Sequence, residues 1–367
     1  MSTTIFNKNN INHLEQPLFF GDAPNVSRFE TTKHNMFESL TERSLSFFWR
    51  PEEFSLTDDG PQFQKMSEAE QHVFTSNLKY QTLLDSVQGR APNIAFLPIV
   101  SDVSLENWIA TWSFSETIHS RSYTHIIRNV YTDPSSVFDE IMLNDAIMKR
   151  AESVTKYYDE LINLVNRYNV DSNSVSLTKI KEMLYLVMHS VNALEAIRFY
   201  VSFACSFSFG QRGIMEGNSK IIKSIARDEA LHLKGTQYIL NLWHSGKDDP
   251  EMKEIAERLK PQAEKLFLDV YEQEREWIDY LLSKGDIPLL NKEILTQYLQ
   301  YVTGSKMRAV GLNSPFNVSK NPIPWIRDWL NSSHVQVTPQ EVEISAYLIS
   351  QMDMNVTDAE LKSLSIS

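Results

Sequence analysis

Glutamate and histidine recur at one spacing, as Glu116 with His119 and as Glu229 with His232. Residues three apart share a face of an α-helix, so each pair can direct a carboxylate and an imidazole at the same point. One such pair usually belongs to a solvated helix face. Two pairs on two helices can hold two metal ions if other helices supply further carboxylates. The doubled spacing therefore predicts a two-metal site.

Two further acids lie among mostly apolar neighbours, Asp85 in YQTLLDSVQGR and Glu195 in SVNALEAIRFYVSF. Buried acids are rare unless they are paired or bound to metal. Together with Glu116 and Glu229 they would carry about four negative charges, which two divalent ions can neutralise. Oxygen and imidazole ligands without thiolates suit iron or manganese, whereas a structural zinc site more often uses cysteine.

The elements that must position these residues are helices. Glycine occurs only 11 times in 367 residues, well below the usual share of about 7%, which disfavours a turn-rich β architecture. We predict long helices at 67–90, 104–130, 180–209 and 216–244, each carrying one of the four acids. No linker divides the chain.

Charge and hydropathy exclude several function classes. The formal charge is 35 − 47 = −12, which argues against binding to nucleic acid or to an anionic membrane. The most apolar stretch, 184–209, is interrupted by Asn192, Glu195 and Arg198, which a membrane span would not tolerate. The start MSTTIFNKNN lacks the pattern of a signal peptide, so we expect a cytoplasmic protein.

Cys205 is the only cysteine. Its apolar setting, FYVSFACSFSF, indicates a small core residue. A reaction that needs a pair of redox thiols therefore cannot be completed by this chain alone.

Longer motifs run through nearly the whole chain: EQPLFFG, LSFFWRPEE, NLKYQTLLDS, FSETIHSRSYTHI, NALEAIRFYVSFACSF, IARDEALH and NPIPWI. With these motifs the chain resembles the small, radical-generating subunit of class I ribonucleotide reductase, of the class Ia type. The resemblance implies an all-α fold, a ferritin-like helical bundle with additional helices around a di-metal carboxylate site. It also implies two parts, a di-iron helical domain at 1–333 and a flexible tail at 334–367 that docks on the large subunit.

Position by position, the resemblance implies roles for single residues. The metal ligands of the family match Asp85, Glu116, His119, Glu195, Glu229 and His232. The radical-bearing tyrosine matches Tyr123, and the residues of the radical transfer route match Trp49, Asp228, Tyr347 and Glu341. The apolar pocket that shields the radical matches Phe199, Phe203 and Ile225. We expect Asp228 to contact His119, because a metal-bound histidine usually donates its outer N–H to a carboxylate.

The implied activity is half of an enzyme. Two iron ions in an oxo-bridged centre, with manganese as the alternative metal, would react with dioxygen and generate a stable tyrosyl radical. A homodimer of this chain would pass the radical equivalent to a large subunit that binds nucleotides and carries the active-site cysteines. There, ribonucleoside diphosphates would be reduced to deoxyribonucleotides for DNA synthesis.

Two alternatives share the ligand set. A di-iron oxygenase or desaturase needs a substrate cavity at the metals and has no use for Tyr123 or Tyr347. A ferritin-type iron-storage protein is usually far shorter and forms cages.

Overall fold

All regular secondary-structure elements are helices in the part described by the computed structural model, residues 4–331, where the only β pairing is two isolated bridges. The α-helices are α1 (Asn35–Ser46), α2 (Asp59–Phe63), α3 (Glu68–Gln88), α4 (Ala91–Ala95), α5 (Val103–Val130), α6 (Pro134–Asp139), α7 (Asp145–Val170), α8 (Leu177–Ala193), α9 (Phe199–Gly210), α10 (Glu216–Ser245), α11 (Pro250–Leu281), α12 (Lys292–Ala309) and α13 (Ile326–Leu330). The all-α prediction is confirmed.

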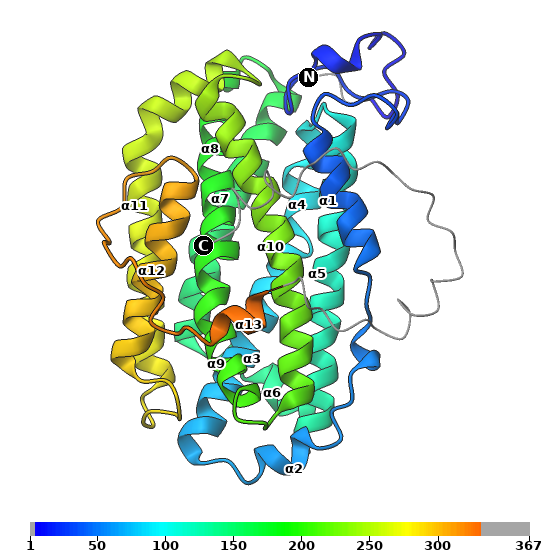
Figure 1. Cartoon of the computed structure of the whole chain (residues 1–367). Coiled ribbons are helices and arrows are strands. Elements are labelled where there is room, and N and C mark those ends of the chain that lie inside the picture. Colours follow the sequence, from blue (N-terminus) through cyan, green and yellow to red (C-terminus); the bar gives the residue numbers. More distant parts are fainter. Residues whose placement is uncertain (1–3, 332–367) are drawn as a thin grey trace.

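The long helices form a bundle, and Figure 1 shows them running along one common direction. The four predicted helices correspond in order to α3, α5, α8 continued by α9, and α10. Short 3-10 turns at His13–Glu15, Pro51–Glu53 and Leu97–Ile99 join or precede them.

Side-chain caps define where the helices of the site begin. At the start of α3, the Ser67 hydroxyl accepts from the Glu70 backbone N–H at 3.3 Å, and the Glu70 carboxylate accepts from the Ser67 N–H at 2.9 Å. At the start of α5, the Asp102 carboxylate accepts from the Leu105 N–H at 2.8 Å. These bonds satisfy N–H groups that have no partner within the helix.

The start of α10 is capped by another helix. The carboxylate of Asp59, in α2, accepts from the N–H of Gly217 at 3.2 Å and from that of Asn218 at 2.7 Å. A side chain at Gly217 would place its Cβ 2.3 Å from the carbonyl oxygen of Ser55, so this close approach requires glycine.

The predicted helix at 180–209 contains an irregular turn. Between α8 and α9, Leu194–Arg198 form a π-helical turn, which we call the π turn, and it carries Glu195. Every residue from 184 to 209 is buried, as expected of a helix that is apolar on all sides in a protein core. Within residues 4–331, no helix combines the length and apolarity needed to span a membrane.

The two helices with the Glu-x-x-His spacing, α5 and α10, approach closely at Gly235. A Cβ at this position of α10 would lie 2.2 Å from the indole ring of Trp108 in α5. The indole therefore packs directly against the α10 backbone, one helical turn beyond His232.

Candidate metal centre

The six predicted ligands come together in the interior of the bundle. They are contributed by α3 (Asp85), α5 (Glu116 and His119), the π turn (Glu195) and α10 (Glu229 and His232). None of their side chains is more than 1% exposed. Four segments far apart in sequence thus direct acids and imidazoles to one place.

The six residues form two overlapping groups. Asp85, Glu116, His119 and Glu229 make one, and Glu116, Glu195, Glu229 and His232 make the other. In each group, one ligand atom from every residue lies within 4.8 Å of the others. Glu116 and Glu229 belong to both groups, so the arrangement suits two neighbouring ions that share two carboxylates.

The shared carboxylates direct one oxygen toward each histidine. His119 Nδ1 lies 3.1 Å from Glu116 Oε2 and 3.2 Å from Glu229 Oε1. His232 Nδ1 lies 3.1 Å from Glu116 Oε1 and 3.0 Å from Glu229 Oε2. Both imidazoles therefore present the same nitrogen, Nδ1, to the same pair of acids.

The donor set fits metal ions. Both carboxylate oxygens of Asp85 and Oε2 of Glu195 are buried and have no hydrogen-bond partner among the described residues. Unpaired buried carboxylate oxygens are costly, and a cation would satisfy them. All donors are oxygen or nitrogen, which suits iron or manganese.

Burial and mutual charge shift the pKa values of Asp85, Glu195 and His232 in the absence of a metal. Burial, followed by the charges of Glu116 and Glu229, raises the pKa of Asp85 well above its usual range. Burial also raises the pKa of Glu195. Burial opposes protonation of His232, but the charge and hydrogen bonds of Glu116 and Glu229 prevail and raise its pKa to about 9. The metal-free cluster thus retains protons that a cation would displace.

The predicted contact between Asp228 and His119 is present. His119 Nε2 lies 3.2 Å from Asp228 Oδ2, on the side of the ring opposite to the ligand cluster. The indole Nε1–H of Trp49 donates to the same Asp228 oxygen at 2.8 Å. The Trp49 ring also stacks on His119, with centroids 6.3 Å apart and an interplanar angle of 27°. Trp49, Asp228 and His119 form a continuous path toward the cluster.

Tyr123 is fully buried, on the same helix as Glu116 and His119. Its hydroxyl makes no hydrogen bond of normal geometry within residues 4–331. Burial and the adjacent Asp85 raise its pKa well above the usual value, so the phenol keeps its proton. The side chains predicted to shield it, Phe199, Phe203 and Ile225, are each 0% exposed.

Two neighbours of the ligands escaped sequence reasoning. Gln88 Nε2 donates to Glu195 Oε1 at 2.6 Å, and Trp112 Nε1 donates to Glu116 Oε1 at 2.9 Å. Gln88 follows Asp85 by three residues and Trp112 precedes Glu116 by four. Both spacings place them on the ligand face of their helix, so helical periodicity could have predicted these two contacts.

Tyr347 and Glu341, predicted for radical transfer, lie outside the described residues, as does the predicted tail at 334–367.

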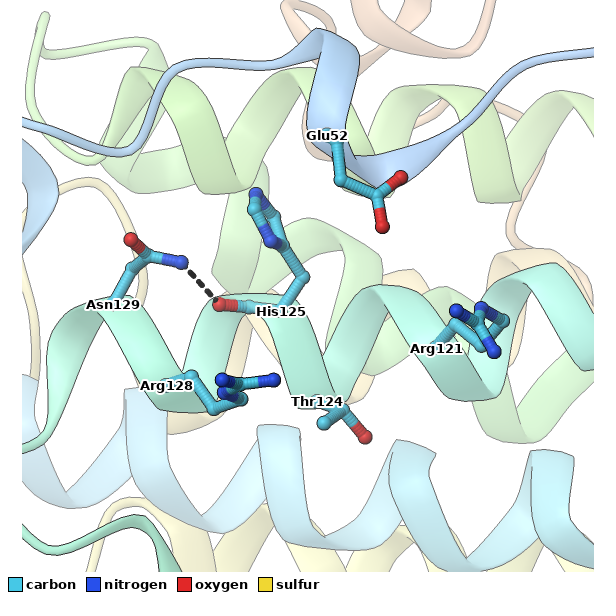
Figure 2. A pocket seen from close by; sticks show the side chains of 6 residues that line it. All are labelled: Glu52, Arg121, Thr124, His125, Arg128 and Asn129. Atoms are coloured by element: carbon cyan, nitrogen blue, oxygen red, sulfur yellow. Dashed lines mark hydrogen bonds between the residues drawn. The ribbon is translucent and has the colours of Figure 1, made fainter.

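A surface hollow of about 610 Å³ lies away from the ligands, along the outer side of α5. Arg121, His125 and Arg128 of α5 line it, and Glu52 faces them from the preceding segment (Figure 2). A second hollow of about 280 Å³ shares Glu52 and Arg121 with it and includes Trp49 in its wall.

The comparisons with known proteins agree on one family. Residues 27–322 match the family model described as ribonucleotide reductase, small chain. The chain is 54% identical to ribonucleoside-diphosphate reductase 1 subunit beta of Escherichia coli O157:H7, over 100% of both chains.

Solved structures show the same fold. The ribonucleotide reductase R2 subunit from Clostridium botulinum superposes with a TM-score of 0.78 at 23% identity, covering 90% of this chain and 99% of that one. The dimanganese(II) NrdF protein of Streptococcus sanguinis superposes with a TM-score of 0.68 at 20% identity, covering 84% of this chain and 99% of that one. The ferritin-like helical bundle expected from the sequence is confirmed.

Proposed function

The chain belongs to the family of ribonucleotide reductase small chains and is thus one subunit of a ribonucleoside-diphosphate reductase; on this premise, we propose that it generates a radical on Tyr123. The observation that carries the proposal is the position of Tyr123, fully buried and next to Asp85 of the ligand cluster. The family match decides against the oxygenase, desaturase and iron-storage alternatives.

Two iron ions are the proposed cofactor. Asp85 and His119 would complete one site, Glu195 and His232 the other, and the shared carboxylates would contribute an oxygen to each. When bound, the two ions supply the oxidation by dioxygen that removes an electron from the phenol. The Streptococcus sanguinis protein carries manganese instead, and metal analysis of the purified chain distinguishes the two metals.

The protein surroundings control the proton and the lifetime of the radical. A phenol that loses an electron also releases its hydroxyl proton, and Asp85, the acid that raises the pKa of Tyr123 most, would accept it. The buried side chains of Phe199, Phe203 and Ile225 would exclude water and reductants from the radical.

The proposed transfer route begins at Trp49. When Trp49 is oxidised, its indole proton can shift to Asp228 Oδ2 along the existing 2.8 Å hydrogen bond. His119 donates to that oxygen from the other side and so couples it to the cluster. Tyr347 and Glu341 would continue the route from the tail to the large subunit, where the reduction takes place.

A homodimer is proposed through the outer side of α5. Phe48 and Phe114 are 40% and 55% exposed and stack on each other, with centroids 6.2 Å apart. A paired apolar patch of this kind is typical of an interface. Glu52 beside Arg121 also makes the face self-complementary, as a two-fold contact with a second copy requires.

Light scattering of the full chain tests the dimer. Phe114→Glu should reduce the mass from that of a dimer to that of a monomer. Val170→Glu, which changes a residue 90% exposed on α7, is the control and should leave the dimer intact. A dimeric Phe114→Glu variant would place the interface elsewhere.

The radical assignment is tested by electron spin resonance after iron loading and exposure to oxygen. Tyr123→Phe should bind iron as the wild type does and show no tyrosyl signal. Tyr298→Phe, a buried tyrosine of α12, is the matched control and should keep the signal. A tyrosyl signal from the Tyr123→Phe variant would contradict the assignment. The cytoplasmic location and the division at residue 333 stay predictions.

A further inference from the structure

Arg198, at the end of the π turn, is held by three helices. Its side chain is 1% exposed. Nη1 donates to Glu274 Oε1 of α11 at 3.0 Å, and Nη2 donates to Ser153 Oγ of α7 at 2.6 Å. Further donations reach the Tyr80 hydroxyl of α3 at 3.3 Å and Gln273 Oε1 of α11 at 2.7 Å.

The partner carboxylate is equally enclosed. Glu274 is 0% exposed, and its Oε1 also accepts from the Tyr80 hydroxyl at 2.7 Å. A buried ion pair is weak evidence for stability, because removing two charges from water offsets most of their attraction. The planar guanidinium does, however, fix the positions of several partners at once, which gives the pair a geometric role.

The other functional residue of the π turn is tied to two of the same helices. Gln88 of α3 donates to Glu195 at 2.6 Å, and the hydroxyl of Tyr158 in α7 donates to Gln88 Oε1 at 3.0 Å. Both Glu195 and Arg198 are thus connected to α3 and α7. Only Arg198 adds a connection to α11.

A π turn needs such an anchor. It contains one more residue than the α-helical path, and such turns are rare and frequently lie at functional sites. If the turn returned to α-helical spacing, Glu195 would rotate by about 100° relative to the rest of the bundle. That rotation would remove its carboxylate from Glu229 and His232.

We propose that Arg198 is a positioning residue whose contacts with Glu274 and Ser153 hold the π turn in the register that directs Glu195 at Glu229 and His232. The proposal rests on the proposed function, in which these three residues bind one of the two metal ions. Arg198 itself is not one of the proposed metal ligands.

The test is an anaerobic titration of the full chain with Mn²⁺, in which electron spin resonance measures the free ion. Wild type should bind two ions per chain. Arg198→Lys keeps the charge but loses the planar fork, and it should weaken one of the two ions by ~10–100-fold, the usual effect of disturbing a group that orients a ligand. The other ion should bind as in wild type.

A control and two combinations identify the affected site. Lys181→Met removes a different buried cation, in α8, which pairs with Asp249 at 2.6 Å, and should leave the binding of both ions unchanged. In the Arg198→Lys variant, the ion that still binds as in wild type should occupy the site of Asp85 and His119. Adding Glu195→Ala should therefore leave this ion bound, whereas adding Asp85→Ala should remove it. If Arg198→Lys does not fold by circular dichroism, Arg198→Met/Glu274→Gln, which removes both charges, is titrated by the same criteria.

Two results would overturn the proposal: unchanged binding of both ions in the Arg198 variant, or equal weakening of both. A different result would refute the metal assignment itself. If Glu195→Ala alone still binds two ions with wild-type affinity, Glu116, Glu195, Glu229 and His232 do not form a metal site. The proposed role of Arg198 would then be wrong as well.

Discussion

Trp49 donates its indole N–H to Oδ2 of Asp228 at 2.8 Å, deep inside the protein. The same oxygen lies 3.2 Å from Nε2 of His119. One carboxylate oxygen therefore accepts from the indole of Trp49 on one side and from the imidazole of a candidate metal ligand on the other. A change of charge on either ring would therefore affect the other through this shared oxygen.

Asp228→Asn should lower the affinity for metal by ~10–100-fold, because a neutral amide stabilises the ligand imidazole less than a carboxylate does. Trp49→Phe is the matched control, since it removes the other donor to Asp228 and leaves the contact with His119. Anaerobic Mn²⁺ titration measures both. Equal weakening by the two substitutions would show that Asp228 does not act through His119.

Tyr123→Phe should leave the metal-free protein as stable as wild type, or more stable by up to ~1 kcal/mol, because it removes a buried hydroxyl without a regular hydrogen bond. Tyr158→Phe deletes a hydroxyl that donates to Gln88 and should destabilise by ~1 kcal/mol. Urea unfolding of the metal-free chains gives both values. A larger loss for Tyr123→Phe than for Tyr158→Phe would contradict the expectation.

Metal binding should release protons at pH 7.5. The pKa of His232 is about 9 in the metal-free state, against an ordinary value of 6.5, so the ring is charged at this pH and must lose a proton before Nδ1 can bind a cation. Its contribution to metal-free stability is present below pH 6.5 and is lost as the pH rises through about 9. An indicator dye in weak buffer should show that His232→Gln releases about one proton fewer per chain.

Lys306→Met should stabilise the metal-free protein more at pH 7 than at pH 9.5. Burial lowers the pKa of Lys306 to about 7, from 10.5. The unfolded chain therefore binds the extra proton between these values, and wild-type stability from this group rises with pH over that window. Methionine has a similar shape and no charge.

Thermal unfolding of wild type and the Lys306→Met variant at both pH values isolates this group, because the shifts of all other groups cancel in the difference. Lys181→Met provides the opposite case, since the pKa of its paired ammonium is raised, and it should destabilise at both pH values. An equal gain for Lys306→Met at the two pH values would show that the Lys306 ammonium is not desolvated.

Sequence reasoning predicted the six candidate ligands that the structure brings together, because their helices show local patterns. Glu116 with His119 repeats the spacing of Glu229 with His232, and Asp85 is conspicuous among apolar neighbours. The contact of Asp228 with His119 followed from the chemistry of metal-bound histidine.

The contact that holds the π turn, between Arg198 and Glu274, could not be predicted from local sequence patterns. Arg198 and Glu274 are separated by 76 residues, and no local pattern relates two buried partners on different helices. The π turn was hidden for another reason. From 184 to 209 every residue is buried, so the apolar run has no polar face whose period could reveal an extra residue.

Gly235 limits which residues position 235 can tolerate, because α5 and α10 approach closely there. The indole of Trp108 occupies the volume that even a methyl group at this position would need. A mutation to alanine would act as a wedge that separates the two Glu-x-x-His helices and lengthens the gap between the sites that share Glu116 and Glu229. The spacing of a two-ion centre thus depends on a glycine that binds no metal and acts only through its lack of a side chain.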